Sequence, residues 1–394
     1  MKALGLSSFY FFLFVTYGAF LPLFPTWLKE HGVRGVAMSA IMATIPALGV
    51  IGPPAFGALS DLLGLRTGLL RIVTAGGLVA TLMIAAPAIL GHTPGIALLF
   101  AAMLLFSTAR APSVAMADVI AVEATKTAQA EGRPRSYGSF RLWGSIGFLL
   151  AAAGVGQIID VHSLRGLPSF LALSSAVTFA LSFALSAEAP PPAKHLGAQL
   201  GRALTDHGFV RLLVAAFLGF GAHVGYDICF SLHLQTLGLD ASWVGGAWAI
   251  GVVAEVVLMA VSGALLARFS AAQLLVTAFV GGALRWLLIA NITNVTVLLA
   301  LQPLHAVSFA LFWVTSLDLI KKRAPREVLA TAQGVFNAAV GAGAVAGMFA
   351  WGALFEAKGG HVMFTAIAGV ALLAAVASAG VSRAPVRARE ANLV

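Results

Sequence analysis

The stretch GALSDLLGLR, residues 57–66, lies between two long apolar runs and carries an acid and a base. The flanking runs cover about residues 38–59 and 69–91, and each supplies the ~20 apolar residues with which a helix crosses a membrane. The glycines allow a tight turn and close packing, while Asp61 and Arg66 can form ion contacts between helices. The stretch therefore predicts a short loop between two membrane-spanning helices, with ion contacts that can differ between conformations.

The composition extends this prediction to the whole chain. Of the 394 residues, 60% are hydrophobic and 10% are charged, whereas soluble domains carry about 25% charged residues. The mean hydropathy is +0.95. Such a chain could not fold in water without exposing large apolar areas, so we expect a polytopic protein embedded in the lipid bilayer.

Charge and cysteine content exclude several other classes. The net charge of +9 comes from basic residues in short connecting segments, without long basic runs or aromatic-basic arrays, so we expect no nucleic-acid partner. Cys229 is the only cysteine, which excludes an intrachain disulfide and a cysteine metal cluster. No nucleophile–base motif or phosphate loop supports an enzyme, and no cofactor or metal is expected. The N-terminal apolar run continues to about Leu28 without a small-residue cleavage site and is therefore expected to be a retained span.

Hydropathy, broken at glycine, proline and charged residues, predicts twelve spans, six on either side of a polar connection. The predicted fold is all-α, with an N-terminal six-helix bundle (1–186), a cytoplasmic central loop (187–208) and a C-terminal six-helix bundle (209–394) that ends in a short tail. Two such halves are typical of transporters with parallel repeats. The expected spans are residues 7–28, 38–59, 69–91, 95–122, 137–159, 167–186, 209–236, 242–267, 271–291, 295–320, 328–355 and 361–381.

The basic residues predict the orientation of these spans, because cytoplasmic loops carry an excess of Lys and Arg. With both termini in the cytoplasm, few of the 24 basic residues lie on the outer side: Lys29, Arg34, Arg165 and Lys358. We therefore expect a multi-pass, monomeric protein of the bacterial cytoplasmic (inner) membrane, with both termini cytoplasmic.

Ionisable residues lie within the predicted spans, among them Asp118, Arg141, Asp227, Glu255, Arg285 and His305. A charge at mid-bilayer depth costs at least ~2.5–3.5 kcal/mol on insertion scales, so such residues usually pair or face a water-filled cavity. Arg110 lies about two turns before Asp118 and needs a counter-charge, from Asp118 or from a substrate carboxylate. These positions predict where the chain handles polar solutes or protons.

Several separated motifs resemble those of one transporter superfamily. Residues 57–66 resemble the G-x-x-x-D-x-x-G-x-R loop of the major facilitator superfamily, which implies a gating role for Asp61 and Arg66. Residues 137–148, YGSFRLWGSIGF, are similar to the Y-G-x-x-R-x-W-G-S-x-G segment of its lactose-permease and phenylpropionate-permease branch. Residues 18–28, GAFLPLFPTWL, and the pair 304–305 agree with the same branch. The resemblance implies a proton symporter that works by alternating access.

The resemblance also implies roles for single residues. Arg141 matches an arginine that holds substrate hydroxyls, and its guanidinium can grip two oxygens of a diol or a carboxylate. Trp143 is a stacking candidate on a different helix face. Asp118 lies three residues after the expected acidic position, Ala115, and could still reach Arg141. Glu255 matches a glutamate that takes part in substrate binding and coupling.

Arg285 and His305 match the arginine and histidine of the proton-coupling cluster, but the chain departs from the branch nearby. One turn after His305, Ser308 stands in place of a proton-carrying glutamate. Asp227 keeps its carboxylate and loses its cationic partner, with His223 one turn before it. Because burial disfavours the charged form of a carboxylate, Asp227 is a candidate to load and release protons.

Structural alternatives stay open for these residues. Arg141 could snorkel to the headgroups, and Asp118 could form a purely structural ion pair. Asp227 could hold a static hydrogen bond to His223. Glu255 could belong to a buried structural triad.

Together these residues predict a secondary transporter that performs proton-coupled symport of a small polar organic solute, a sugar or an aromatic carboxylate. The alternative is a proton antiporter that exports amphipathic compounds, suggested by the abundant aromatics and by Ser308. A non-transporting receptor is a third alternative, against which the intramembrane charges argue. Substrate contact is assigned to Arg141, Asp118, Trp143 and Glu255, and proton coupling to Asp227, Glu255, His305 and Arg285.

Overall fold

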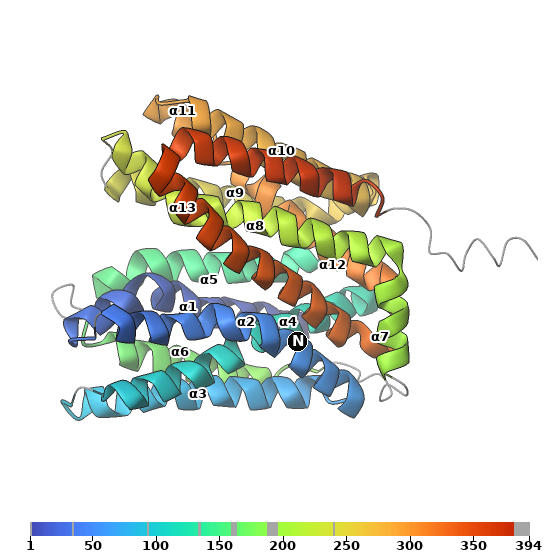
Figure 1. Cartoon of the computed structure of the whole chain (residues 1–394). Helices are drawn as coiled ribbons and strands as arrows, with labels where there is room; N and C mark the ends of the chain where they lie inside the picture. The colour runs from blue at the N-terminus through green and yellow to red at the C-terminus, as the bar shows by residue number, and fades with distance from the viewer. Residues whose placement is uncertain are drawn as a thin grey trace, which may run out of the picture. The chain divides into compact units, whose positions relative to one another are not determined.

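The computed structural model describes residues 2–33, 35–92, 94–132, 135–158, 164–186, 196–238 and 241–381. In these ranges every regular element is a helix, as Figure 1 shows. The chain divides into two compact units, Met1–Lys194 and His195–Val394. Residues 187–195 of the predicted central loop, Arg34, and the predicted tail from residue 382 lie outside the described residues.

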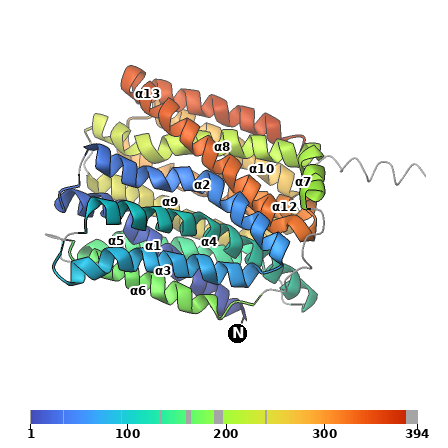
Figure 2. The same ribbon diagram turned by 60° about the horizontal axis from the view of Figure 1, so that its bottom comes forward.

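The first unit is a bundle of six long helices. Helix α1 packs against α5 and α6, α3 packs against α4 and α6, and α2 packs against α4. In Figure 2 the neighbours α3 and α4 run side by side. The helices are α1 (Lys2–Glu30), α2 (Gly35–Leu63), α3 (Arg66–Ile89), α4 (Ile96–Ala130), α5 (Tyr137–Ile158) and α6 (Leu167–Ser182).

The second unit is built around the pairing of α8 with α13, and α10 packs against α13 as well. Its elements are α7 (Leu196–Thr205), α8 (His207–Thr236), α9 (Ala241–Arg268), α10 (Ala271–Asn291), α11 (Val295–Ala300), a π-helix (Ala306–Leu311), α12 (Phe312–Arg323), a short 3-10 helix (Arg326–Val328) and α13 (Leu329–Ser378).

These helices fill the twelve predicted spans. Eight helices of the described ranges are long and apolar enough to cross a membrane. One of them, α13, contains two spans, because the backbone at Gly359 leaves the helical region (φ 76°, ψ 178°). The span predicted over 295–320 is a broken helix made of α11, a turn, the π-helix and α12. Pro303 lies at the break, where its missing N–H cannot continue a helix.

The observed helices differ from the predicted elements at two boundaries. Part of the expected central loop is helical, since residues 196–205 form α7. The junction after it is fixed by Asp206, which accepts a hydrogen bond from the N–H of Phe209 (2.7 Å) and pairs with Arg323 (2.6 Å). Helix α4 continues to Ala130, well beyond residue 122, where its apolar run ends. The polar turns after 122 are part of the same helix.

Small residues allow the closest helix contact in the first unit, between α1 and α5. A Cβ atom added to Gly147 on α5 would overlap the carbonyl oxygen of Phe11 on α1. Both atoms belong to helix backbones, so relieving the overlap requires one helix to shift against the other. Interfaces of this kind are how membrane helices gain packing energy without a hydrophobic effect.

We expect Gly147→Val to lower the thermal unfolding temperature of the purified protein in detergent, at an overpacking cost of about 1–3 kcal/mol. Gly154→Val is the matched control, because it lies on the same helix with nothing near its added side chain. The control carries the same cost of a β-branched residue in a helix. Equal unfolding temperatures for the two variants would contradict the close α1–α5 contact.

Candidate functional site

The first polar cluster joins α1, α4 and α5 inside the first unit. Asp118 on α4 is buried, and its Oδ1 accepts hydrogen bonds from the hydroxyls of Tyr10 (2.7 Å) and Tyr137 (2.9 Å). Arg141 follows Tyr137 by one turn on α5, and its guanidinium carbon lies 4.1 Å above the centre of the Phe14 ring. The i, i+4 spacing places Tyr10 and Phe14 on one face of α1, and Tyr137 and Arg141 on one face of α5.

This cluster contains one negative and one positive side chain, Asp118 and Arg141. The positive charge of Arg141 acts on the carboxylate of Asp118, while two phenol hydroxyls supply its hydrogen bonds. Buried charges are retained where a counter-charge and hydrogen bonds replace water. The structure thus brings together the two residues assigned to substrate contact in this half, Asp118 and Arg141. Both side chains are buried, so neither snorkels at the surface of the unit.

The aromatic partners of this cluster were not predicted from the sequence. Tyr137 is the first residue of the motif that carries Arg141, and its spacing from Arg141 was the available signal. Tyr10 and Phe14 had no signal beyond an aromatic-rich first span. Trp143 lies on another face of α5 and is 43% exposed, so it is placed apart from the buried cluster.

The second cluster surrounds Arg285 of α10, which is completely buried. Its Nη2 donates to Oε1 of Gln302 (2.9 Å), and its Nη1 lies 3.4 Å from Nδ1 of His305. The guanidinium carbon is 3.9 Å from the centre of the Tyr226 ring, whose hydroxyl also donates to Gln302 (2.9 Å). Tyr226 and Gln302 therefore hold the side chain of Arg285 in place.

Two carboxylate–imidazole pairs lie beside Arg285. Nε2 of His305 is 3.6 Å from a carboxylate oxygen of Glu255, and Nε2 of His223 is 3.6 Å from Oδ1 of Asp227. The two imidazole rings are 5.3 Å apart between centres. The side chain of Glu255 is 6% exposed and that of Asp227 is 33% exposed. All four residues assigned to proton coupling thus lie in one continuous polar cluster, which His223 completes.

Ser308, which the family resemblance aligns with a glutamate, lies in the same cluster. Its hydroxyl donates to the carbonyl oxygens of Leu304 and His305, and it lies 3.5 Å from Nη1 of Arg285. It sits within the π-helix that follows His305. Single π turns inside helices occur frequently at functional sites, and this one is surrounded by the buried polar groups.

The motif of residues 57–66 forms a third cluster at the junction of α2 and α3. Arg66 lies 3.4 Å from Asp61 and also pairs with Glu123 of α4. All three side chains are buried. The extension of α4 past residue 122 supplies Glu123, which was not predicted as a partner because the apolar run ends at residue 122.

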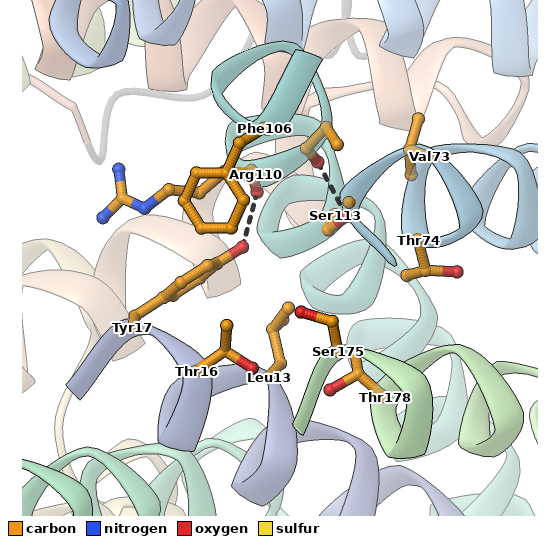
Figure 3. Close-up of a pocket in the computed structure, with 12 residues that line it drawn as sticks. Leu13, Thr16, Tyr17, Val73, Thr74, Phe106, Arg110, Ser113, Ser175 and Thr178 are labelled. Atoms are coloured by element: carbon orange, nitrogen blue, oxygen red, sulfur yellow. Dashed lines mark hydrogen bonds between the residues drawn. The ribbon is translucent and has the colours of Figure 1, made fainter. Parts of the chain in front are cut away.

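A small pocket opens between α1, α3, α4 and α6 in the first unit (Figure 3), with about 320 Å³ of empty space that includes open solvent. Hydroxyl groups of Thr16, Ser113, Ser175 and Thr178 gather around it. Tyr17 borders it and donates a hydrogen bond to the carbonyl oxygen of Arg110 (3.1 Å). Arg110 is among the residues that line this pocket, whereas the residues that the sequence assigned to substrate contact or proton coupling are not.

Comparisons with known proteins agree with this architecture. A family model described as "MFS_1 like family" matches residues 3–366. The probable 3-phenylpropionic acid transporter of Escherichia coli (strain K12) is 28% identical over 369 residues, which cover 92% of this chain and 93% of that protein. The maltose permease of Geobacillus stearothermophilus is 28% identical over 335 residues, covering 84% and 82%. The solved structure of the Escherichia coli fucose:proton symporter has a TM-score of 0.74 at 13% identity, with 97% and 98% of the chains covered.

Proposed function

Because the chain belongs to the MFS_1 like family, and thus to the major facilitator superfamily, we propose that it is a proton-coupled symporter of a small polar organic solute. It is a multi-pass membrane transporter and not an enzyme. The resemblance to the phenylpropionate-permease branch, drawn from the motifs, is confirmed. The proposal further specifies the direction of transport, its coupling to protons, the class of solute, and the residues that bind the solute or carry the proton.

The observation that carries the proposal is the buried cluster of Glu255, His305 and Arg285. Its carboxylate and imidazole lie 3.6 Å apart, an ion-pair distance once the imidazole is protonated, and the guanidinium lies beside the same imidazole. A fixed positive charge next to a titratable pair changes how readily that pair holds a proton. In this proposal Asp227, Glu255 and His305 carry the proton and Arg285 tunes them.

Substrate contact is proposed for the buried pair Asp118 and Arg141, with Trp143 and Glu255 as additional contacts. The guanidinium offers planar paired donors, and the carboxylate of Asp118 offers acceptors, so the pair can hold a hydroxyl or a carboxylate of a solute. The names of the two curated relatives, an aromatic acid transporter and a sugar permease, support the same two solute classes.

Transport is proposed to proceed by alternating access, in which the halves expose a central site to either side in turn. Asp61, Arg66 and Glu123 are the proposed gate, because ion contacts between helix ends can be kept in one conformation and broken in the other. Protonation drives the cycle only if it stabilises one conformation more than the other. The excess of basic residues in the predicted inner loops supports cytoplasmic termini. A monomer in the cytoplasmic (inner) membrane completes the proposal.

We expect purified protein in liposomes to accumulate labelled solute when the outside is more acidic than the inside. Labelled maltose and 3-phenylpropionate serve as the two probes. Liposomes without protein are the necessary control, because a weak acid crosses bilayers in its neutral form and collects on the alkaline side. A protonophore should abolish the protein-dependent accumulation.

The same vesicles separate the alternatives. The antiporter is favoured by Ser308 in place of an acid, and it would accumulate solute when the inside is more acidic. Counterflow without any gradient distinguishes both carriers from a protein that does not transport. Accumulation under the inverted gradient would overturn symport and leave transport intact.

A further inference from the structure

We infer that the transported solute is an organic anion and that Arg110 binds its carboxylate. The inference rests on the proposed function and names the solute class of the same half of the transporter. Arg110 lies near the middle of α4, about two turns from Asp118. Sequence position alone left two partners open for it, Asp118 or a solute.

The structure shows that Asp118 is not the partner of Arg110. The carboxylate of Asp118 is held by Tyr10 and Tyr137 and is influenced by the charge of Arg141. Across the described residues, no carboxylate forms an ion pair with Arg110. Its Nε is buried without a hydrogen-bond partner. Arg110 is thus a half-buried cation with no protein counter-charge in that part of the chain.

An aromatic ring holds Arg110 in place instead. Its guanidinium carbon lies 4.7 Å from the centre of the Tyr17 ring, a contact that orients a cation without neutralising it. Figure 3 shows its side chain beside Phe106 and Tyr17, with the guanidinium directed away from the hydroxyl groups of the pocket. The donors of Arg110 are therefore not used by that pocket.

Arg110 and Arg141 share one aromatic face of α1. Phe14 lies under Arg141 and Tyr17 under Arg110, and the two rings touch edge to face with centres 5.6 Å apart. The face thus carries two guanidinium groups and one carboxylate, Asp118. One carboxylate from the solute would neutralise the remaining positive charge, whereas a neutral sugar would not. Arg141, already balanced by Asp118, then contacts an uncharged oxygen of the solute.

Binding of matched acids and alcohols tests the inference directly. Thermal stabilisation of the full-length protein in detergent is measured with benzoate and 3-phenylpropionate, with benzyl alcohol and 3-phenylpropan-1-ol, and with maltose. We expect the acids to stabilise the wild-type protein and the neutral compounds to have much smaller effects. Arg110→Gln should weaken acid binding by about tenfold or more, because a charge-assisted bidentate contact is lost.

Two further variants separate binding from folding. Arg71→Gln is the matched control, because Arg71 also stacks on an aromatic ring, that of Phe183 (4.9 Å), and also has a buried Nε without a partner. We expect this variant to bind acids like the wild type. Arg110→Lys keeps the charge at the site and should retain part of the acid binding even if Arg110→Gln unfolds.

Each outcome decides the inference. Unchanged acid binding in Arg110→Gln would overturn it, as would stabilisation by maltose or the alcohols equal to that by the acids, or no stabilisation by any acid. Maltose counterflow that is normal in Arg110→Gln would overturn the anion class and support the transport function. Acid binding that depends on Arg110, without counterflow, would support the inference and overturn the proposed transport.

Discussion

Replacing Arg141 with lysine is expected to reduce counterflow of the solute by about 100-fold or more while the protein stays folded. Arg141 lies on the Phe14 ring and under the influence of Asp118 at the same time. A planar guanidinium can stack on a ring and still direct donors to two oxygens in its own plane. The ammonium group of lysine is a compact point charge and cannot both stack on the ring and direct paired donors to two oxygens. The solute would therefore lose the aligned hydrogen-bond donors of Arg141.

Arg135→Lys is the matched control for this prediction. Arg135 precedes the same helix and lies over the Phe140 ring (5.8 Å), outside the cluster of Asp118. We expect wild-type counterflow from it. The thermal unfolding temperature of both variants reports folding independently of transport. If Arg141→Lys retained counterflow within about threefold of the wild type, substrate contact would have to be assigned to other residues.

The fold could be predicted from the sequence because a bilayer leaves few alternatives. Helix length and the need to satisfy every backbone group fix the spans, and the motifs at residues 57–66 and 137–148 identify the superfamily. A hydropathy profile reports only the length of an apolar run, so the span predicted for α4 ends at residue 122 and excludes Glu123. It also read residues 196–205 as loop, because α7 is too short and polar to be a span.

The charged residues of the candidate site could be predicted from the sequence, whereas their neutral hydrogen-bond partners could not. Intramembrane charges such as Asp118, Arg141 and Arg285 are rare enough to be recognised singly. Their partners, Tyr10, Gln302 and others, are ordinary residues of apolar spans and come from helices far apart in sequence. Only the tertiary contacts of α1 and α5 with α4, and of the turn that contains Gln302 with α10, bring those partners within hydrogen-bond distance. Arg110 could be identified from the sequence as an intramembrane charge. The three-dimensional contacts were needed to show that Asp118 is not its partner.

The second large effect is expected for Asp227→Asn, which should keep solute exchange and lose accumulation driven by a pH gradient. Asp227 is the more exposed carboxylate of the second cluster, with 33% of its side chain accessible against 6% for Glu255. It is therefore the proposed entry point for protons, which reach His305 and Glu255 past His223. Asparagine keeps the shape and cannot ionise, so solute would only equilibrate across the membrane. Exchange needs no net proton movement and should continue.

Asp318→Asn is the control for this variant, because Asp318 also belongs to an i, i+4 pair, with Lys322 (2.6 Å), at the charged end of α12. We expect it to accumulate solute like the wild type. The measurement compares gradient-driven uptake with counterflow in the same liposomes. Normal accumulation by Asp227→Asn would transfer the coupling role to Glu255, and Glu255→Gln should then show the loss. Failure of both exchange and accumulation would instead make Asp227 a residue that the solute itself requires.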